Sequence, residues 1–470
     1  MKKSYQELIS QNFQFPQKEF ELKNNFLSFH QIPLKQLINK YGTPLRLIYL
    51  PDISHKIKQA NTWFDKAIKQ HRYSGSYQYC YCTKCNHYHH VLAEALKENI
   101  NLETSSSFDI DIILSLYHQQ KINNSITIVH NGYKTDDYLK KIIELQALGF
   151  KNSIVILDSI NELKRLKKWS KSRKVKIGLR MAIEEESKST FNTSRLGIQA
   201  NLMLDFYYQH IHSNPDFKLK MIHFFVDSGI KDSLYYWGEF QKALNIYIEI
   251  KKHSKQLDSF NIGGGFPIQN QLKFNYDYEA IIDKIILKIK LSCNSENIKE
   301  PDIYTEFGKY TVGESSAIIF EVLEQKKQND TENWYIIDNS LLNTIPDAWY
   351  LHEKFILLPI NKWESEYQKV NIGGISCDQS DYYNSEDFNQ EILLPKFNDK
   401  DKEPLYIGFF HTGAYQDAVS GYGGAKHCLI PSPKQIIIDK DKDGNLIDFV
   451  FSNEQKTSEV FKILGYPKTN

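Results

Sequence analysis

The stretch YQYCYCTKCNHYHHVLAEALKE, residues 77–98, decides the fold. Its first part has the dense aromatic and apolar character of a buried strand, and its second part carries apolar residues at helical spacing. The same strand-then-helix unit recurs along the chain. The strand-type runs are LRLIYL (45–50), YQYCYC (77–82), SITIVHNG (125–132), SIVILDS (153–159), KVKIGLRMA (174–182), LKMIHFFVDSG (219–229) and FNIGGGFP (260–267). This alternation predicts an α/β fold with parallel strands.

The number of units favours a closed barrel. Six to eight units in about 280 residues fit a (β/α)8 TIM-like barrel better than two doubly wound domains, and we place the barrel at residues 45–312. After residue 312 the strand-type runs follow one another without helices. They are SAIIFEVLEQK (316–326), NWYIIDNS (333–340), KFILLPI (354–360), QIIID (435–439) and LIDFVF (446–451). Residues 313–470, with the N-terminal segment 1–44, therefore predict a second, antiparallel β domain.

The composition excludes several classes of protein. The 470 residues include 58 basic and 57 acidic side chains, so a net charge of +1 gives no general attraction to nucleic acid or an anionic membrane. No apolar run is long enough to span a membrane, and residues 1–15 lack the apolar core of a signal peptide. Six cysteines do not make a disulfide framework. We therefore expect a cytoplasmic globular protein.

Two candidate sites, Lys84 and the segment Gly263–Gly265, lie at the carboxyl ends of predicted strands, where barrel active sites are built. Lys84 follows the run YQYCYC, where a lysine can form a Schiff base, although an ordinary solvated lysine has the same position. Gly263–Gly265 end another run, where backbone amides can approach a phosphate, although three glycines also suit a tight turn.

Further candidates are carboxylates and a thiol. Glu306 ends the run IYTEF, where a carboxylate can keep a cofactor ring nitrogen protonated, although a solvated glutamate fits the pattern equally. Cys377 with Asp378 and Asp381 suggests an acid donor beside a cation-binding pair, although a structural cysteine is the commoner case. Cys80, Cys82 and Cys85 do not have zinc-ligand spacing, and we expect no metal site.

Taken in order, these segments resemble the fold-type III decarboxylases that use pyridoxal 5′-phosphate, the alanine-racemase-like barrel group. TKCN (83–86) resembles their P-x-K-x-N motif and VHNGYK (129–134) their C-N-G-Y-K motif. SLLNTIPDAWY (340–350) resembles the S-x-F-Q-S-x-P-D-A-W segment of the arginine decarboxylases of polyamine synthesis. The resemblance covers nearly the whole chain, from residue 42 to residue 417.

The resemblance implies roles for individual residues. Lys84 and Cys377 are implied as catalytic, with Lys84 holding the cofactor and Cys377 entering the active site of a second subunit in a head-to-tail homodimer. Asp378 and Asp381 are implied as binders of the distal cation of the substrate. The residues implied around pyridoxal 5′-phosphate are Lys84, Glu103, Arg180, Phe225, Ser228, Gly263, Gly264, Gly265, Glu306, Gly308 and Tyr415.

Four positions depart from the family pattern. Phe225 stands where the family has a histidine against the cofactor ring, and Asp227 stands where glycine is usual. Lys309 replaces an arginine and so loses its two-pronged hydrogen bonding. Cys82 replaces the proline of the lysine motif.

The implied activity is the decarboxylation of L-arginine to agmatine and carbon dioxide in polyamine biosynthesis. The same reaction on ornithine, lysine or meso-diaminopimelate is an open alternative, and so is a binding or regulatory relative without activity. The presence of both Lys84 and Cys377 argues against the last. A racemase is less favoured, because it needs a second base on the opposite face of the ring.

Overall fold

The computed structural model describes residues 18–171, 173–184, 193–270, 274–384, 392–398 and 401–467. The chain divides into two compact units. The barrel unit contains Ser54–Pro267 and Tyr276–Thr311, and the sheet unit contains the chain up to Ile53, Ile268–Asn275 and the chain from Val312 onward. Among the described residues, no helix has both the length and the apolar content needed to cross a membrane.

Eight parallel strands close the barrel unit. They are β5 (Tyr77–Cys82), β6 (Asn101–Thr104), β7 (Ile128–His130), β8 (Ser153–Leu157), β9 (Val175–Ala182), β11 (Phe217–His223), β12 (Ser259–Asn261) and β13 (Asp302–Glu306). Each pairs in parallel with the next, and β13 pairs with β5 to complete the ring. The predicted TIM-like barrel is confirmed.

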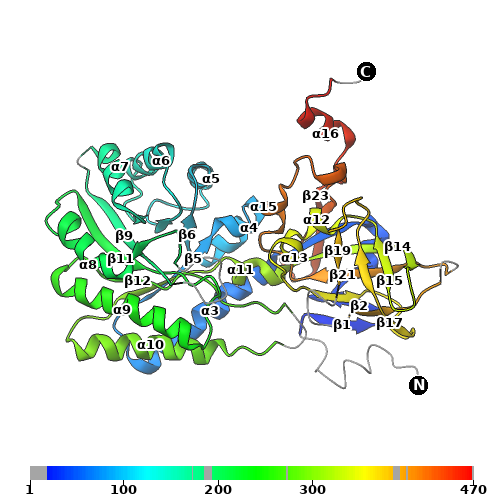
Figure 1. The fold of residues 1–470 in the computed structure, drawn as a ribbon, viewed down its shortest axis with the longest axis horizontal. Helices are drawn as coiled ribbons and strands as arrows, with labels where there is room; N and C mark the ends of the chain where they lie inside the picture. Colours follow the sequence, from blue (N-terminus) through cyan, green and yellow to red (C-terminus); the bar gives the residue numbers. More distant parts are fainter. Residues whose placement is uncertain are drawn as a thin grey trace. The chain divides into compact units, whose positions relative to one another are not determined.

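Helices lie around the strands (Figure 1). They are α3 (Leu50–His71), α4 (His89–Ala95), α5 (Ser107–His118), α6 (Asp136–Ala147), α7 (Ile160–Ser170), α8 (Met203–Phe206), α9 (Leu234–His253) and α10 (Tyr278–Ser295). Several begin at a side-chain cap in the loop that follows a strand. The hydroxyl of Ser106 accepts from the Asp109 amide in a capping box, and Thr135 and Ser159 cap α6 and α7. These caps fix the residue at which each helix begins and therefore the length of the loop that precedes it.

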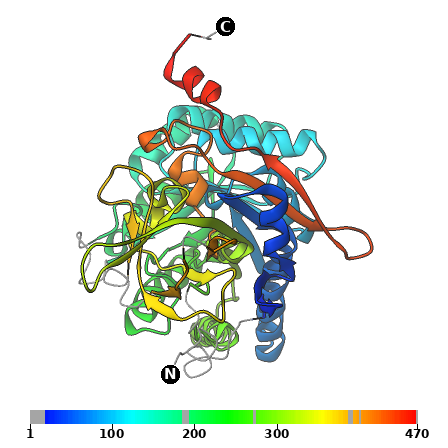
Figure 2. The ribbon, with the colours of Figure 1, turned by 90° about the vertical axis from the view of Figure 1, so that its right-hand side faces the viewer.

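The sheet unit is built on a second sheet, drawn mainly in yellow and orange in Figure 2. Its strand order is β19-β18-β15-β14-β4-β22-β23, and β21 pairs with both β14 and β16. The bounds are β4 (Leu45–Tyr49), β14 (Ser316–Lys327), β15 (Asn333–Ile337), β16 (Ile356–Pro359), β18 (Asn371–Gly373), β19 (Tyr382–Tyr383), β21 (Leu405–Phe410), β22 (Lys434–Lys440) and β23 (Leu446–Ser452). The sheet is mainly antiparallel, but β4–β22 and β15–β18 are parallel pairs.

Smaller elements complete the sheet unit. They are β1 (Phe20–Lys23), β2 (Phe26–Phe29), β3 (Ile32–Pro33), α2 (Leu34–Tyr41), α11 (Lys309–Val312, which begins in the barrel unit), α12 (Leu341–Thr344), α13 (Pro346–Tyr350), β17 (Tyr367–Lys369), β20 (Leu393–Pro395), α15 (Gln416–Ser420) and α16 (Thr457–Leu464). The hairpins of β1, β2 and β3 were not expected from the sequence.

Strand β4 differs from its predicted place. The sequence predicts the run LRLIYL as a barrel strand, but β4 pairs with β14 and β22 in the sheet unit. All five of its residues are buried, so both faces are covered by other elements. A strand buried on both faces has the same apolar pattern in the centre of a mixed sheet as in a parallel barrel. The first barrel strand is therefore β5, and a boundary at residue 45 lies one strand too early.

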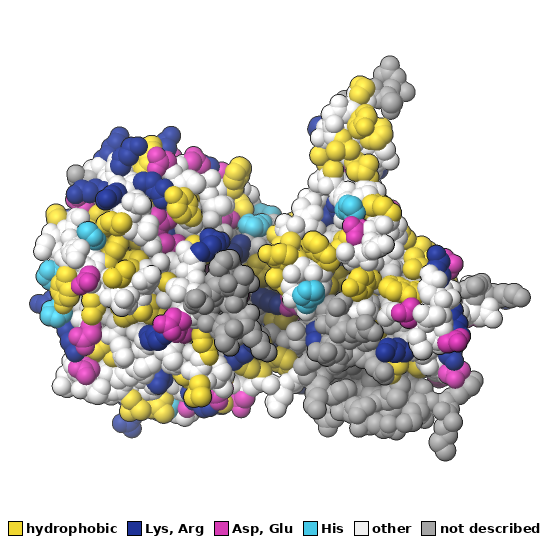
Figure 3. Space-filling view, viewed as in Figure 1, with side chains coloured by type: hydrophobic (Ala, Val, Ile, Leu, Met, Phe, Trp, Pro, Cys, Tyr) yellow, Lys and Arg dark blue, Asp and Glu magenta, His cyan; other side chains and the backbone are white. Residues whose placement is uncertain are grey.

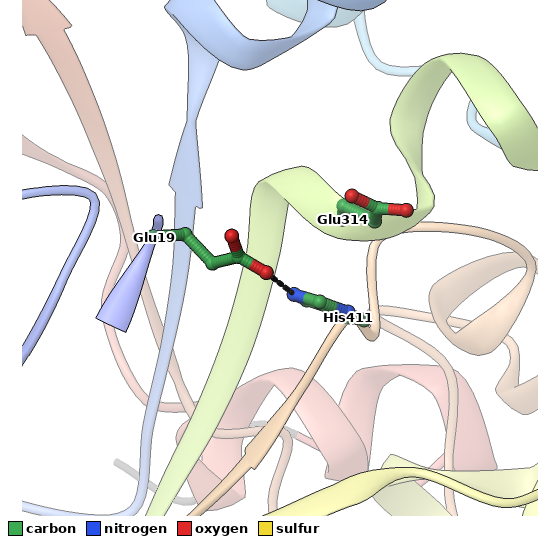
Figure 4. Close-up of side chains that lie close together, drawn as sticks. All are labelled: Glu19, Glu314 and His411. Atoms are coloured by element: carbon green, nitrogen blue, oxygen red, sulfur yellow. Dashed lines mark ion pairs between the residues drawn. The ribbon is translucent and has the colours of Figure 1, made fainter. Parts of the chain in front are cut away.

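A largely buried charge cluster holds the first described strand against the rest of the sheet unit (Figure 4). Glu19 precedes β1, and its Oε1 atom lies 3.5 Å from Nε2 of His411, which follows β21. Glu314 is the third member, and its Oε1 accepts a hydrogen bond from the Gln269 amide. Burial alone would lower the pKa of His411, but the two carboxylates raise it. We interpret this cluster as an internal ion pair that anchors the N-terminal strand.

Candidate active site

The polar residues of the barrel unit gather at the carboxyl ends of its strands. Lys84 lies in the 3-10 turn Thr83–Cys85 directly after β5, and Glu103 lies near the end of the neighbouring β6. Glu306 is the last residue of β13, which flanks β5 on the other side. The predicted residues Lys84, Glu103 and Glu306 therefore come from three adjacent strands, at the end where barrel active sites are built.

Glu306 is buried and held by three neighbouring strand ends. Its Oε1 accepts a hydrogen bond of 2.8 Å from Asn261 Nδ2, and its Oε2 accepts one of 2.9 Å from Asn131 Nδ2. His223 Nε2 lies 3.3 Å from Oε2. Burial alone would raise the pKa of Glu306, but His223, Lys84 and Asn131 lower it to about 2. Glu306 is therefore an ionised, oriented carboxylate.

Lys84 and Glu103 form the second charged group. Lys84 Nζ lies 3.5 Å from Glu103 Oε2, and the lysine side chain is 43% exposed whereas Glu103 is fully buried. The Cys82 thiol and the Asn131 amide also act on the Glu103 carboxylate and lower its pKa, whereas burial raises it. The carboxylate of Glu103 raises the pKa of Lys84, which burial opposes. The pair holds an amine at the mouth of the barrel, with a buried negative charge beside it.

The backbone of the segment Gly263–Gly265 packs directly against the backbones at and after the ends of two other strands. Gly263 and Gly265 have φ values of +69° and +107°, and a side chain at Gly264 would lie 2.3 Å from the Glu306 carbonyl oxygen. The amide of Ile230 donates a hydrogen bond of 2.9 Å to Gly265, which brings the loop containing Ser228 against the glycines. The two predicted phosphate-binding segments are thus adjacent, with no Cβ between them.

The guanidinium of Arg180 lies over the ring of Phe225. The Arg180 guanidinium lies 5.9 Å from the centre of the Phe225 ring, in the range of a cation–π contact. Its Nε is buried and has no hydrogen-bond partner among the described residues. Burial lowers the pKa of Arg180, and the nearby Asp158 opposes this. The aromatic residue that replaces the family histidine therefore contacts the other residue expected near the cofactor ring.

Gly308 positions the lysine turn. A Cβ at Gly308 would lie 2.0 Å from Cys85 Sγ and 3.0 Å from Cys82 Cβ. The Cys82 thiol also donates to the Glu306 carbonyl oxygen over 3.1 Å. Only glycine allows the end of β13 to lie so close to the turn that carries Lys84. Gly308 therefore supports the site through packing.

The remaining predicted residues belong to the sheet unit. Cys377 is exposed, and Asp378 Oδ2 lies 3.4 Å from His427 Nε2. Tyr415 precedes α15 with a left-handed φ of +66°. Each is described within its own unit.

Asp381 differs from its predicted role. It is buried, its Oδ1 accepts from the amides of Leu341 and Leu342, and its Oδ2 accepts from the amide of Ser376. A carboxylate whose oxygens are committed to backbone donors is not available to a substrate cation. We therefore correct the prediction for Asp381: this residue fixes the loop that carries Cys377.

Three residues that orient Glu306 were not predicted from the sequence, namely Asn131, Asn261 and His223. Each is the last residue of a strand or follows it directly, and this position was the available signal. Asp158, directly after β8, was also missed. Both of its side-chain oxygens are buried and lack hydrogen-bond partners in the described chain.

These unpartnered atoms test whether the site fits pyridoxal 5′-phosphate. Buried polar atoms normally have partners, so a group of them marks a place for a polar ligand. At the strand ends that the structure describes, the unpartnered buried atoms include both side-chain oxygens of Asp158, Arg180 Nε and His223 Nδ1. With the Lys84 amine, the Glu306 carboxylate and the glycine cradle, they match the aldehyde, ring nitrogen and phosphate of this cofactor. The residues at these strand ends therefore fit pyridoxal 5′-phosphate.

Comparisons with known proteins agree with this geometry. The biosynthetic arginine decarboxylase of Prochlorococcus marinus (strain AS9601) is 24% identical over 92% of this chain and 84% of its own length. The crystal structure of the biosynthetic arginine decarboxylase of Campylobacter jejuni superposes with a TM-score of 0.79 at 21% identity, covering 96% of this chain and 89% of that one.

A diaminopimelate decarboxylase structure from M. jannaschii gives a TM-score of 0.78 at 16% identity, covering 94% of this chain and 97% of that one. The likeness to these structures shows a shared fold. The family model "Pyridoxal-dependent decarboxylase, pyridoxal binding domain" matches residues 53–313. This region is more than half of the chain and holds every barrel residue of the site, so the chain belongs to the pyridoxal-dependent decarboxylases.

Proposed function

We propose that this protein decarboxylates L-arginine to agmatine and carbon dioxide in polyamine biosynthesis. The observation that carries the proposal is the Lys84–Glu103–Glu306 arrangement, in a chain whose curated relatives over 92% of its length are named biosynthetic arginine decarboxylases. The diaminopimelate decarboxylase fold is almost equally similar, so the overall fold does not select the substrate.

The segment Pro346–Trp349, whose resemblance favours arginine as the substrate, is hydrogen-bonded to the loop that contains Tyr415. Asp347 in α13 accepts a hydrogen bond of 2.8 Å from Gln416 Nε2, and the Asp347 amide donates to Gln416 Oε1 over 3.3 Å. Both side chains are buried. The reciprocal pair joins Pro346–Trp349 to the segment 413–417, which the resemblance places at the phosphate. This link supports a role for α13 in shaping the site.

Each of the barrel residues of the site has a separate role in the proposed reaction. When bound, pyridoxal 5′-phosphate supplies an electron sink for the carbanion that remains after carbon dioxide leaves. Lys84 would hold the cofactor through its amine. The low pKa of Glu306 keeps its carboxylate ionised, and this negative charge would keep the ring nitrogen protonated. Arg180 and Phe225 form one wall of the site. Ser228 and the glycines bind the phosphate through a hydroxyl and backbone amides.

The sheet unit supplies the remaining groups. Cys377 donates a proton to the product, and Asp378 binds the guanidinium of arginine. Contact with the Cys428 sulfur raises the pKa of Cys377, which keeps the thiol protonated at neutral pH. A protonated thiol suits a proton donor. Asp378 is exposed and so retains oxygen lone pairs for a substrate.

We infer a head-to-tail homodimer in which Cys377 enters the site of the second copy. Large apolar side chains are exposed on α13, directly after it, and beside Cys377 and Cys428 in the sequence: Trp349, Tyr350, Leu351, Ile375 and Leu429. Exposed apolar patches of this kind mark protein contacts. Figure 3 shows apolar side chains gathered on the sheet unit and on α16. Free thiols in all six cysteines support the expected cytoplasmic location.

The test is release of carbon dioxide from arginine by the cofactor-loaded protein and its Lys84→Ala variant. Lys140→Ala is the matched control, because Lys140 is an exposed lysine of α6 whose ion pair with Glu144 spans 3.9 Å. The proposal expects activity in the parent and the control and none above background in Lys84→Ala. Equal activity in all three proteins would refute it.

A further inference from the structure

Cys377 and Cys428 are the two exposed cysteines of the chain, and they face each other. Their sulfur atoms lie 3.5 Å apart, although the two residues are 51 positions apart in sequence. The other four cysteines, Cys80, Cys82, Cys85 and Cys293, are buried. The fold therefore brings together the only two thiols that solvent reaches within the described chain.

One short helix holds both cysteine loops. The Leu341 amide of α12 donates a hydrogen bond of 2.8 Å to Asp381, which in turn accepts from the Ser376 amide next to Cys377. Asn343 of the same helix donates a hydrogen bond of 3.0 Å to the His427 carbonyl oxygen, next to Cys428. Because hydrogen bonds to α12 hold both loops, the fold itself sets the short distance between the two sulfur atoms.

A second contact fixes the register of the two loops. His427 Nε2 lies 3.4 Å from Asp378 Oδ2, so the neighbours of the two cysteines also face each other. A disulfide needs a sulfur separation of about 2.05 Å. The two sulfurs must therefore approach each other by about 1.5 Å, and both belong to exposed side chains that lie outside the strands.

We propose that Cys377 and Cys428 form a reversible disulfide in the presence of a peroxide, and that the disulfide switches off the enzyme. One thiol first loses its proton to solvent, and the resulting thiolate attacks hydrogen peroxide and becomes a sulfenic acid, while the displaced hydroxide takes up a proton and leaves as water. The second thiolate attacks the sulfenic sulfur, forms the S–S bond and releases a second water. Two thiols and one peroxide thus give one disulfide and two waters, and a low-molecular-weight dithiol reverses the change.

The loss of activity rests on the proposed function, because it follows from the role of Cys377 as proton donor. In the disulfide Cys377 carries no proton, so the product carbanion cannot receive one from it.

The test treats the cofactor-loaded protein with hydrogen peroxide, blocks the remaining thiols and digests it without reduction. Mass spectrometry then searches for a peptide pair linked through Cys377 and Cys428, lighter by two hydrogen atoms than the two free peptides. Carbon dioxide release from arginine is measured before oxidation, after it and after dithiothreitol. Cys428→Ser removes the partner thiol, and Cys293→Ser removes a buried thiol of α10 as the matched control.

We expect the linked peptide in the parent and in Cys293→Ser, within a single chain on a non-reducing gel. Both should lose activity about tenfold or more on oxidation and regain it with dithiothreitol. In Cys428→Ser, Cys377 should oxidise to sulfinic acid, and dithiothreitol should not restore activity.

Absence of the linked peptide in the parent, with Cys377 oxidised as irreversibly as in Cys428→Ser, would overturn the proposal. A linked peptide with unchanged activity would also overturn the switch, and would place the error in the role of Cys377. If the untreated protein does not act on arginine, the proposed function fails, whereas the linked peptide still decides whether the disulfide forms.

Discussion

Asn261 and Glu306 end neighbouring strands of the barrel, and the Asn261 amide donates a hydrogen bond of 2.8 Å to the Glu306 carboxylate. Together with Asn131 and His223, this bond fixes the orientation of the carboxylate that is expected to face the ring nitrogen. A buried carboxylate oriented in this way needs no reorganisation during the reaction. The contact makes Asn261 a positioning residue.

Asn261→Ala should reduce kcat about tenfold to 100-fold, because it leaves Glu306 Oε1 without its donor. Asn101→Ala is the matched control, since Asn101 begins β6 at the opposite end of the barrel and donates to Gln78 over 3.0 Å. Steady-state kinetics and the cofactor absorbance spectrum check the prediction. Equal kcat values for the two variants would show that the bond to Glu306 has no role.

Gly264→Ala should weaken cofactor binding about tenfold or more, because its Cβ would lie 2.3 Å from a backbone oxygen and must push the end of β13 away. Gly238→Ala is the control. Gly238 lies in α9, and no atom lies within 4 Å of the place that a Cβ would take, so alanine there should stabilise the helix by about 0.5–1 kcal/mol. Cofactor titration and thermal unfolding distinguish the two. Parental cofactor affinity in Gly264→Ala would contradict the close approach.

Asp378 and Asp381 should behave differently although they are neighbours in the sequence. Asp378→Asn should raise KM for arginine about tenfold with a smaller effect on kcat, because a charge-assisted contact to the guanidinium is lost. Asp381→Asn should lower the free energy of unfolding by about 1–3 kcal/mol, because one acceptor of backbone amides is lost. Kinetics and denaturant unfolding of both variants provide the check. A raised KM in a fully stable Asp381→Asn protein would restore the predicted substrate role of Asp381.

Asp338 should make the stability of the sheet unit depend on pH. Burial raises the pKa of Asp338 to about 7 in the folded chain, so the folded state binds its proton more tightly than the unfolded state. The stabilisation is complete below the ordinary aspartate pKa and is lost as the pH rises through about 7. For a pKa raised from 3.8 to about 7, its size is on the order of 4 kcal/mol.

Asp338→Asn cannot ionise and keeps an oxygen for the Glu321 amide, which donates to Asp338 over 3.1 Å. Its free energy of unfolding should therefore fall less than that of the parent between about pH 5 and about pH 8. Denaturant unfolding at both pH values measures the difference. A parallel decrease in the two proteins would mean that Asp338 is already ionised at low pH.

The barrel was predictable because its pattern is local. Most strand-type runs are followed by a helix-type run, and the glycines, Lys84 and Glu306 stand at the ends of strand-type runs. Strand β4 could not be placed in this way, because five buried residues in a row do not show which sheet covers them. The register of β4 with β14 and β22 depends on chain segments far away in sequence.

The sequence predicts which residues belong to the site better than it predicts the contacts among them. Asp381 had the pattern of a free carboxylate beside Cys377, but its oxygens bind amides of α12, which lies some 40 residues earlier in the chain. The approach of Cys428 to Cys377 likewise depends on α12. His223, Asn131 and Asn261 converge on Glu306 only because the barrel closes. Such convergence is a property of the tertiary fold and leaves no sequence spacing to detect.

The most direct test of the central claim is a substrate panel. The cofactor-loaded protein would be incubated separately with arginine, ornithine, lysine and meso-diaminopimelate, and both carbon dioxide and the amine product would be measured. We predict agmatine and carbon dioxide from arginine, with little turnover of the other three. Efficient decarboxylation of another amino acid, or no decarboxylation of any, would contradict the assignment.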